Sequence, residues 1–201
     1  MKATDIMHPE DQKAIGALKK IPFIDEMCRS CMEIAYEKIY RGENLGMMVK
    51  VDNTYMPEFY QDLKDVTKAI GIKTPELFIY NDPVMNAFTF GETNPYVCVS
   101  SSLVEKMNRE ERKAILAHEC GHILCQHVLY GSVVETLRMI GEDFGIIGYT
   151  LTGPVKLALQ YWSRRSEYSA DRCAAAVVGE RTFQASMLKL ALGLADAGID
   201  T

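Results

Sequence analysis

Positive charge is scarce in this sequence, and its start contains no long apolar run. Its 22 lysines and arginines are outnumbered by 27 aspartates and glutamates, which gives a net charge of −5 at pH 7. Binding of nucleic acid phosphates needs a basic face, so no nucleic acid partner is expected. Because residues 1–20 have no long apolar core, we expect no secretory signal and a cytoplasmic protein.

One apolar stretch, residues 144–162, approaches the length of a membrane-spanning helix. Gly153 and Pro154 interrupt it, and Lys156 places a charge within it. These residues favour buried helices or a partner-facing surface over a membrane span. Peripheral contact with a membrane stays open as a lesser alternative.

The sequence has six cysteines, and without a secretory signal they are expected to be reduced thiols. Cys28 and Cys31 form a CxxC pair, but no second pair completes the four ligands of a structural zinc site. Their spacing also fits one face of a helix over residues 23–41. Core packing is therefore favoured for the pair, with a metal or redox role as the alternative.

The 201 residues are enough for one domain with a core, and no internal repeat or low-complexity segment divides them. Helical patterns cover residues 9–41 with a break near Pro22, 56–71, 109–130, 132–141, 155–178 and 181–197. Strand patterns cover residues 47–51, 76–82, 86–91 and 96–100, and the last two would form a hairpin. The sequence thus predicts an α+β fold, mainly helical with a small sheet.

Histidine is rare, with four residues in all, yet three of them lie in the segment AILAHECGHILCQH, residues 114–127. His118 and His122 are four residues apart, so on a helix their Cβ atoms lie about 5–6 Å apart and both imidazoles can reach one zinc ion. Glu119 lies about 100° around the helix, where it can reach a metal-bound water as a general base. The alternative is an ordinary core helix that contains histidines.

Other residues of this segment lead to three further predictions. Asn108 followed by Glu111 predicts a capping box at its start. Gly121 removes a side chain between the two histidines, which could allow a second helix to approach. His127 lies about 140° around the helix from His122, so it is expected to be structural or exposed rather than a ligand.

A zinc hydrolase needs a third protein ligand and leaves a fourth position for water. The best candidate lies in SRRSEYSADRCAAA, residues 163–176, where a helix would place Arg164, Glu167 and Asp171 on one face. Glu167 would complete a His, His, Glu site. Asp171 could accept a hydrogen bond from the far nitrogen of a ligating histidine. A solvated helix with an ordinary charge pattern is the alternative.

These segments resemble the zinc peptidases of the HtpX and CAAX prenyl protease type, peptidase family M48. The likeness rests on NAFTFG and YVCVSSSLVEKM (86–91 and 96–107), EERKAILAHECGHILCQH (110–127) and SRRSEYSADRCAA (163–175). It covers roughly residues 56 to 178. The last block is the most discriminating, because many unrelated zinc peptidases share the HExxH pattern.

The resemblance implies a zincin-like fold and a Zn²⁺ cofactor. It implies that His118, His122 and Glu167 are the zinc ligands, that Glu119 is the base, and that Asp171 supports the site.

It also implies that Asn86, at the start of an edge strand bordering the active site, hydrogen-bonds the substrate backbone; a plain turn residue is the alternative. Arg164 and Tyr168 are candidates to stabilise the oxyanion, though each could equally be structural, since no histidine follows His127. Membrane members of the family carry transmembrane helices between the second and third blocks. Here the interval 128–162 is short, so a soluble relative is expected.

The predicted function is a zinc-dependent endopeptidase that acts on a peptide or protein substrate, using a metal-activated water and Glu119 as the general base. Two alternatives stay open: a zinc-stabilised protein that binds an extended peptide without cleaving it, and a zinc amidase for a small non-peptide substrate. A single domain over residues 1–201 is predicted. It would comprise a helical N-terminal part at about 1–45, a catalytic core at about 46–178 and a C-terminal helix at about 181–197.

Overall fold

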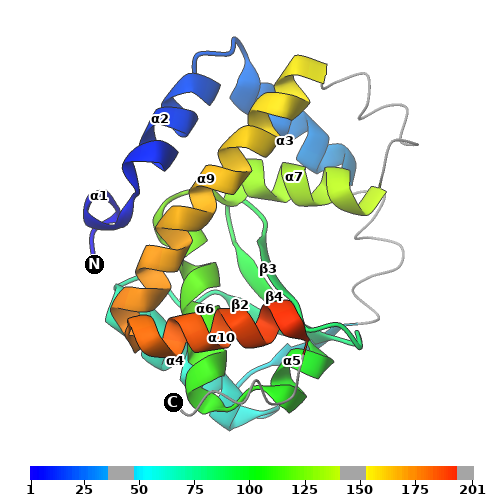
Figure 1. Ribbon diagram of the computed structural model, residues 1–201. Coiled ribbons are helices and arrows are strands. Elements are labelled where there is room, and N and C mark those ends of the chain that lie inside the picture. Colours follow the sequence, from blue (N-terminus) through cyan, green and yellow to red (C-terminus); the bar gives the residue numbers. More distant parts are fainter. Residues whose placement is uncertain (36–47, 141–152, 194–201) are drawn as a thin grey trace.

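The computed structural model describes residues 1–35, 48–140 and 153–193, which form helices around one small sheet (Figure 1). The helices are α1 (Ala3–Ile6), α2 (Pro9–Leu18), α3 (Ile24–Ala35), α4 (Pro57–Ile70), α5 (Ser101–Lys106), α6 (Arg109–Leu124), α7 (Val128–Ile140), α9 (Gly153–Val178) and α10 (Glu180–Leu192). The strands are β1 (Met48–Val51), β2 (Glu76–Tyr80), β3 (Ala87–Phe90) and β4 (Tyr96–Ser100). The predicted α+β class, mainly helical with a small sheet, is confirmed.

The sheet is mixed, with its four strands in the order β1-β2-β4-β3. β2 and β4 run parallel, β1 pairs antiparallel with β2, and β3 pairs antiparallel with β4. The predicted hairpin is therefore present, with Ala87 opposite Val99 and Phe90 opposite Tyr96. β3 is an edge strand of this sheet, and both α6 and α7 contact it. This edge is where the sheet meets the histidine-bearing helix.

Local signals in the sequence set the ends of several helices. Gly71 ends α4 with a φ of 87°, a left-handed conformation that glycine adopts without a Cβ clash. At the start of α6, the predicted capping box joins the side chain of each of Asn108 and Glu111 to the backbone N–H of the other. Lys189 of α10 also donates to the Glu111 carboxylate at 2.8 Å. Glu111 thus links α10 to the start of α6.

The segment predicted as one helix over residues 109–130 is two helices. Between α6 and α7, Gln126 adopts a left-handed φ of 59°. The prediction of one continuous helix was wrong, because a residue with positive φ interrupts the helical hydrogen-bond ladder. The chain turns at His127, whose backbone N–H still donates to the carbonyl oxygen of His122 at 2.9 Å.

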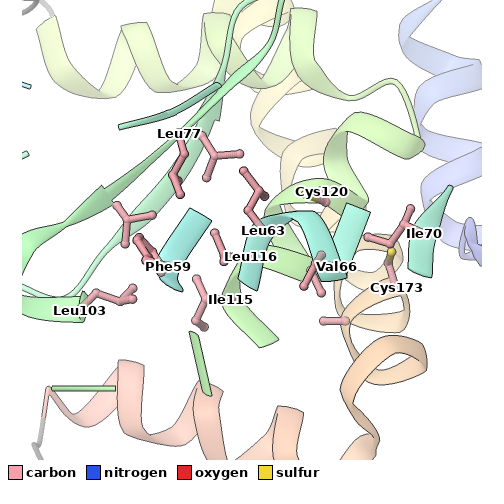
Figure 2. Packing of buried hydrophobic residues seen from close by; sticks show 14 of the residues in the cluster. Phe59, Leu63, Val66, Ile70, Leu77, Leu103, Ile115, Leu116, Cys120 and Cys173 are labelled. Carbon is pink, nitrogen blue, oxygen red and sulfur yellow. The ribbon is translucent and has the colours of Figure 1, made fainter. Parts of the chain in front are cut away.

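Two clusters of buried apolar side chains hold the fold together. The first packs the sheet against α4, α6 and the C-terminal half of α9, and Figure 2 shows Leu63, Leu116, Cys120 and Cys173 within it. The second packs α2, α3 and α7 around the N-terminal half of α9, where Trp162 is fully buried. Because α9 contributes to both clusters, it joins the N-terminal helices to the part of the fold that contains the sheet (Figure 1).

The core packing expected of Cys28 and Cys31 is confirmed, because both are buried in the second cluster. The apolar stretch 144–162 is described only from Gly153 onward, where α9 begins. Among the described helices, none has both the length and the apolar character that a membrane crossing needs. The predicted C-terminal helix is α10, and residues 194–197 of that prediction lie outside the described residues.

Candidate functional site

α6 makes its most extensive helix contact with α9, and the two helices lie very close together at Gly121. A Cβ added to Gly121 would lie 2.9 Å from the Cβ of Cys173 and 3.0 Å from the Cα of Ala170. Non-bonded carbon atoms pack best at about 3.5–4.0 Å, so only glycine fits here without a shift. The helix approach expected from this glycine is confirmed, and it brings the histidines of α6 against α9.

Three side chains from these two helices converge on one point. The Nε2 of His118 lies 3.2 Å from one Glu167 carboxylate oxygen, and the Nε2 of His122 lies 3.7 Å from the other. Two atoms bound about 2 Å from a tetrahedral metal lie roughly 3.3 Å apart. The nitrogen and oxygen atoms of this group all lie within 4.8 Å of one another. Donor type and spacing therefore both fit a single zinc ion.

The opposite nitrogen of His118 also faces a carboxylate. Its Nδ1 lies 3.0 Å from Oδ1 of Asp171, one helical turn after Glu167 on α9. A metal-binding histidine commonly contacts a carboxylate through its second ring nitrogen, which fixes the tautomer and the ring orientation. Asp171 occupies that position relative to His118.

The electrostatics of the group also suit a cation. Burial alone would lower the pKa of His118, but hydrogen bonds with Asp171 and Glu167 outweigh burial and raise that pKa to about 10. The Glu167 side chain is about half exposed, at 49%. Its partial burial would raise the pKa of its carboxyl group, yet its hydrogen bond with His118 and the nearby histidine charges lower that pKa to about 2. Burial lowers the pKa of His122 to about 3, so that imidazole is neutral with a free lone pair. The site thus combines an ionised carboxylate and a neutral imidazole with a preference for positive charge.

Glu119 lies beside this group, and a residue of the sheet holds its side chain in place. It is only 6% exposed, and its Oε2 accepts a hydrogen bond of 2.7 Å from the hydroxyl of Thr89 in β3. The same hydroxyl lies 3.2 Å from the Glu119 carbonyl oxygen. Burial raises the pKa of Glu119, and the charge of His118 and the Thr89 hydrogen bond oppose that rise. The carboxylate is therefore fixed in position and more basic than an exposed one.

A pocket of about 750 Å³ opens over the group, between β3, α7 and α9. His118, Glu119, His122 and Glu167 all line it. Such a volume lies within the range of known ligand sites.

The remaining predicted site residues are placed differently. Asn86, just before β3, lines the pocket, and so does Arg164 of α9. Tyr168 does not line it; its ring lies 5.1 Å from that of His8, and its hydroxyl lies 3.4 Å from the Arg165 guanidinium. The structure therefore does not bring Tyr168 to the site.

Two contacts beside the site were missed by the sequence reasoning, which expected His127 to be structural or exposed and gave Asp11 no role. His127 is 1% exposed, and its Nδ1 lies 3.1 Å from Nδ1 of His122. Asp11 of α2 lies behind it, with Oδ2 2.9 Å from Nε2 of His127. The helical angle misplaced His127 because α6 ends before that residue. Asp11 is far from the motif in sequence, and no pattern around it indicated the contact.

Comparison with known proteins identifies the chain's relatives. The family model for Peptidase family M48 matches residues 56–195. The chain belongs to this family. The matched M48 region contains β2 to β4 and every member of the His118, His122 and Glu167 group. The α2 helix, which carries Asp11, precedes the matched region.

Similar proteins are named as peptidases. The plastoglobule-localized metallopeptidase 48 of the Arabidopsis thaliana chloroplast is 29% identical over 196 residues, covering 96% of this M48 chain and 57% of that protein. A protease HtpX homolog from Nitrosomonas europaea is 33% identical over 153 residues, 61% of this chain and 52% of that protein. Protease HtpX from Acinetobacter baylyi is 29% identical over 212 residues, 88% of this chain and 70% of that protein.

The M48 chain therefore spans little more than half the length of the first two relatives. No solved structure matches it.

Proposed function

We propose that this M48 chain is a zinc-dependent endopeptidase that hydrolyses peptide bonds with Glu119 as the general base. The observation that carries the proposal is the convergence on one pocket of two imidazoles and the Glu167 carboxylate, with the buried carboxylate of Glu119 beside them. A structural zinc site would close all four positions with protein ligands and would need no separate carboxylate. Three ligands and an adjacent base match the plan of a hydrolytic site.

Zinc held by His118, His122 and Glu167 would lower the pKa of water and polarise the scissile carbonyl group. Glu119 would accept the proton of the attacking water and pass it to the leaving amine. Its raised pKa supports this role, because a base works best when its pKa approaches the operating pH. The Thr89 hydroxyl would keep the carboxylate aimed at the water.

The substrate is proposed to be an extended peptide or protein segment. Residues 86–89 line the pocket at an edge of the sheet, and a peptide can add to such an edge through main-chain hydrogen bonds. Asn86 would bind the substrate backbone there. Arg164 lines the pocket from α9 and is the proposed stabiliser of the oxyanion, while Asp171 would hold the ring of His118.

The proposed peptidase domain is residues 1–201 as a single unit. α2 and α3 share their apolar cluster with α7 and α9, which supports including the N-terminal helices with the catalytic core. All six cysteines are free and buried, which supports a reducing compartment such as the cytoplasm as the working location.

The test is chelator-sensitive cleavage. The purified chain, loaded with zinc, is incubated with unfolded casein and with a peptide library, with and without a chelator, and products are identified by mass spectrometry. Internal cleavage of peptide bonds that stops with chelator is expected. Glu119→Gln should retain zinc and lose the cleavage, because the amide cannot accept the proton.

Two outcomes would point to the rival functions. Zinc-dependent binding of peptides without any product would favour a protein that binds an extended segment. Cleavage confined to small non-peptide amides would favour an amidase. Full activity in Glu119→Gln would remove that residue from the mechanism.

A further inference from the structure

His122 is backed by a chain of buried polar groups that leads into α2. Its Nδ1 lies 3.1 Å from Nδ1 of His127, and the Nε2 of His127 lies 2.9 Å from the Asp11 carboxylate. His127 is 1% exposed and Asp11 is 0% exposed. A buried charge requires a partner, and Asp11 finds one in the imidazole that contacts a candidate zinc ligand.

The roles of the ring nitrogens follow from the metal position. His122 turns Nε2 toward Glu167, so that atom must be free of a proton to bind a metal, and the proton then sits on Nδ1. The Nδ1 of His127 must accept that hydrogen bond, which leaves its own proton on Nε2. Nε2 is the atom that faces the Asp11 carboxylate. One arrangement of protons therefore places a donor opposite an acceptor in both contacts.

Two side chains of α9 hold Asp11 and His127 in place. The Ser169 hydroxyl donates to the same Asp11 oxygen and accepts from the backbone N–H of His8. The His127 ring stands edge-on to the ring of Trp162, with 5.5 Å between centroids. Ser169 and Trp162 are both buried on α9, the helix that carries Glu167. The helix α9 therefore carries both Glu167, the third candidate ligand, and the side chains that support the contacts behind His122, the second.

We propose that Asp11 and His127 are positioning residues for the metal site, orienting His122 and fixing its tautomer through the contact Asp11–His127–His122. This inference rests on the proposed zinc site. Asp171 contacts His118 directly, whereas Asp11 acts on His122 through one intervening imidazole. Since α2 precedes the region matched by the family model, the proposal gives a residue outside that region a part in building the site.

The first test measures zinc affinity. Zinc affinities of folded wild type, Asp11→Asn and Ala14→Gly are compared by competition with a chromophoric chelator, after circular dichroism has confirmed that each chain is folded. Ala14 is buried on the same helix, so Ala14→Gly loosens α2 without touching the contact chain. Losing a direct partner of a metal ligand typically weakens metal affinity about 10–100-fold, and Asp11 acts one imidazole further away, so the lower end of that range applies. We expect about a tenfold or larger loss for Asp11→Asn and less than about a twofold loss for Ala14→Gly.

The second test needs no variant. Histidine ring ¹⁵N spectra of the zinc-loaded wild type report which nitrogen carries each proton. The expected result is a proton on Nδ1 of His122 and on Nε2 of His127. A proton on Nδ1 of His127 would overturn the proposal, since that nitrogen could not accept from His122.

The affinity comparison separates this inference from the proposed function. If the wild type binds zinc but cleaves nothing, the proposed endopeptidase function is overturned and the positioning role stands. If the wild type cleaves peptides and the zinc affinity of Asp11→Asn is within twofold of the wild-type value, only the positioning role is overturned. Equal weakening in Asp11→Asn and Ala14→Gly would also overturn it, because the effect would then come from a loosened helix. Wild type without zinc affinity would overturn both.

Discussion

Gly121 of α6 lies against the backbone of Ala170 of α9, so that an added Cβ would come 3.0 Å from the Ala170 Cα and 3.3 Å from its carbonyl oxygen. Backbone atoms of a packed helix cannot move aside as a flexible side chain would. Gly121→Ala should therefore force α6 and α9 apart and destabilise the fold by about 1–3 kcal/mol. That loss outweighs the gain of about 0.5–1 kcal/mol that alanine brings to a helix interior. Urea unfolding measures the change.

The matched control is another helical glycine. A Cβ at Gly16 of α2 would meet nothing within 4 Å, so Gly16→Ala should leave stability unchanged or raise it. If Gly121→Ala were as stable as Gly16→Ala, the close approach of α6 and α9 would be incorrect.

Thr89→Val should lower the rate of cleavage while leaving the metal in place. Valine keeps the shape of threonine but removes the hydroxyl that donates to the Glu119 carboxylate at 2.7 Å. A base held less firmly spends less time aimed at the water, and we expect kcat to fall about tenfold, equivalent to roughly 1.4 kcal/mol. Steady-state kinetics and zinc content are the measurements.

Thr89→Ser serves as the control because it keeps the hydroxyl, and it should retain most of the activity. Equal losses in Thr89→Val and Thr89→Ser would contradict this account, because serine keeps the hydroxyl that donates to Glu119.

Asp171→Ala should weaken zinc binding. The carboxylate lies 3.0 Å from Nδ1 of His118, and its loss frees the ring to turn and removes a negative charge near the metal. A loss of about 10–100-fold in zinc affinity is expected, measured by chelator competition. Glu180→Gln removes an exposed carboxylate at the start of α10 and should change the affinity little. An unaltered affinity in Asp171→Ala would contradict the role given to that residue.

The cysteines should resist thiol reagents while the chain is folded. Burial raises the pKa of Cys28 and of Cys125 to about 12 each, and the thiolate is the reactive form. At pH 7.5 we expect slow labelling of native protein by a disulfide reagent, and reaction of all six thiols in urea. Rapid labelling of Cys28 or Cys31 in the native chain would revive a redox or metal role for that pair.

Part of the candidate site could be predicted from the sequence because the information is local. His118 and His122 are one turn apart on one helix, so their spacing alone sets their geometry. Glu167 and Asp171 follow the same rule on a second helix, and the segment around them resembles a known family. The structure brings His118, His122 and Glu167 together, as that reasoning predicted.

The rest depends on tertiary structure that the sequence does not encode locally. The residue with a left-handed conformation after α6 is Gln126 and not a glycine. Its residue type therefore did not predict the turn that places His127 beside His122. Asp11 meets His127 only because the second apolar cluster packs α2 beside α9. A lone aspartate on an amphipathic helix has no pattern that distinguishes it from a solvent-facing charge.

The central claim is that two imidazoles of α6 and one carboxylate of α9 hold a single zinc ion. Elemental analysis of wild type and of Glu167→Ala, each saturated with zinc and then desalted, tests it most directly. The account predicts about one zinc per folded wild-type chain and a large loss in the folded variant. Wild type without zinc, or Glu167→Ala with the full wild-type amount, would contradict it.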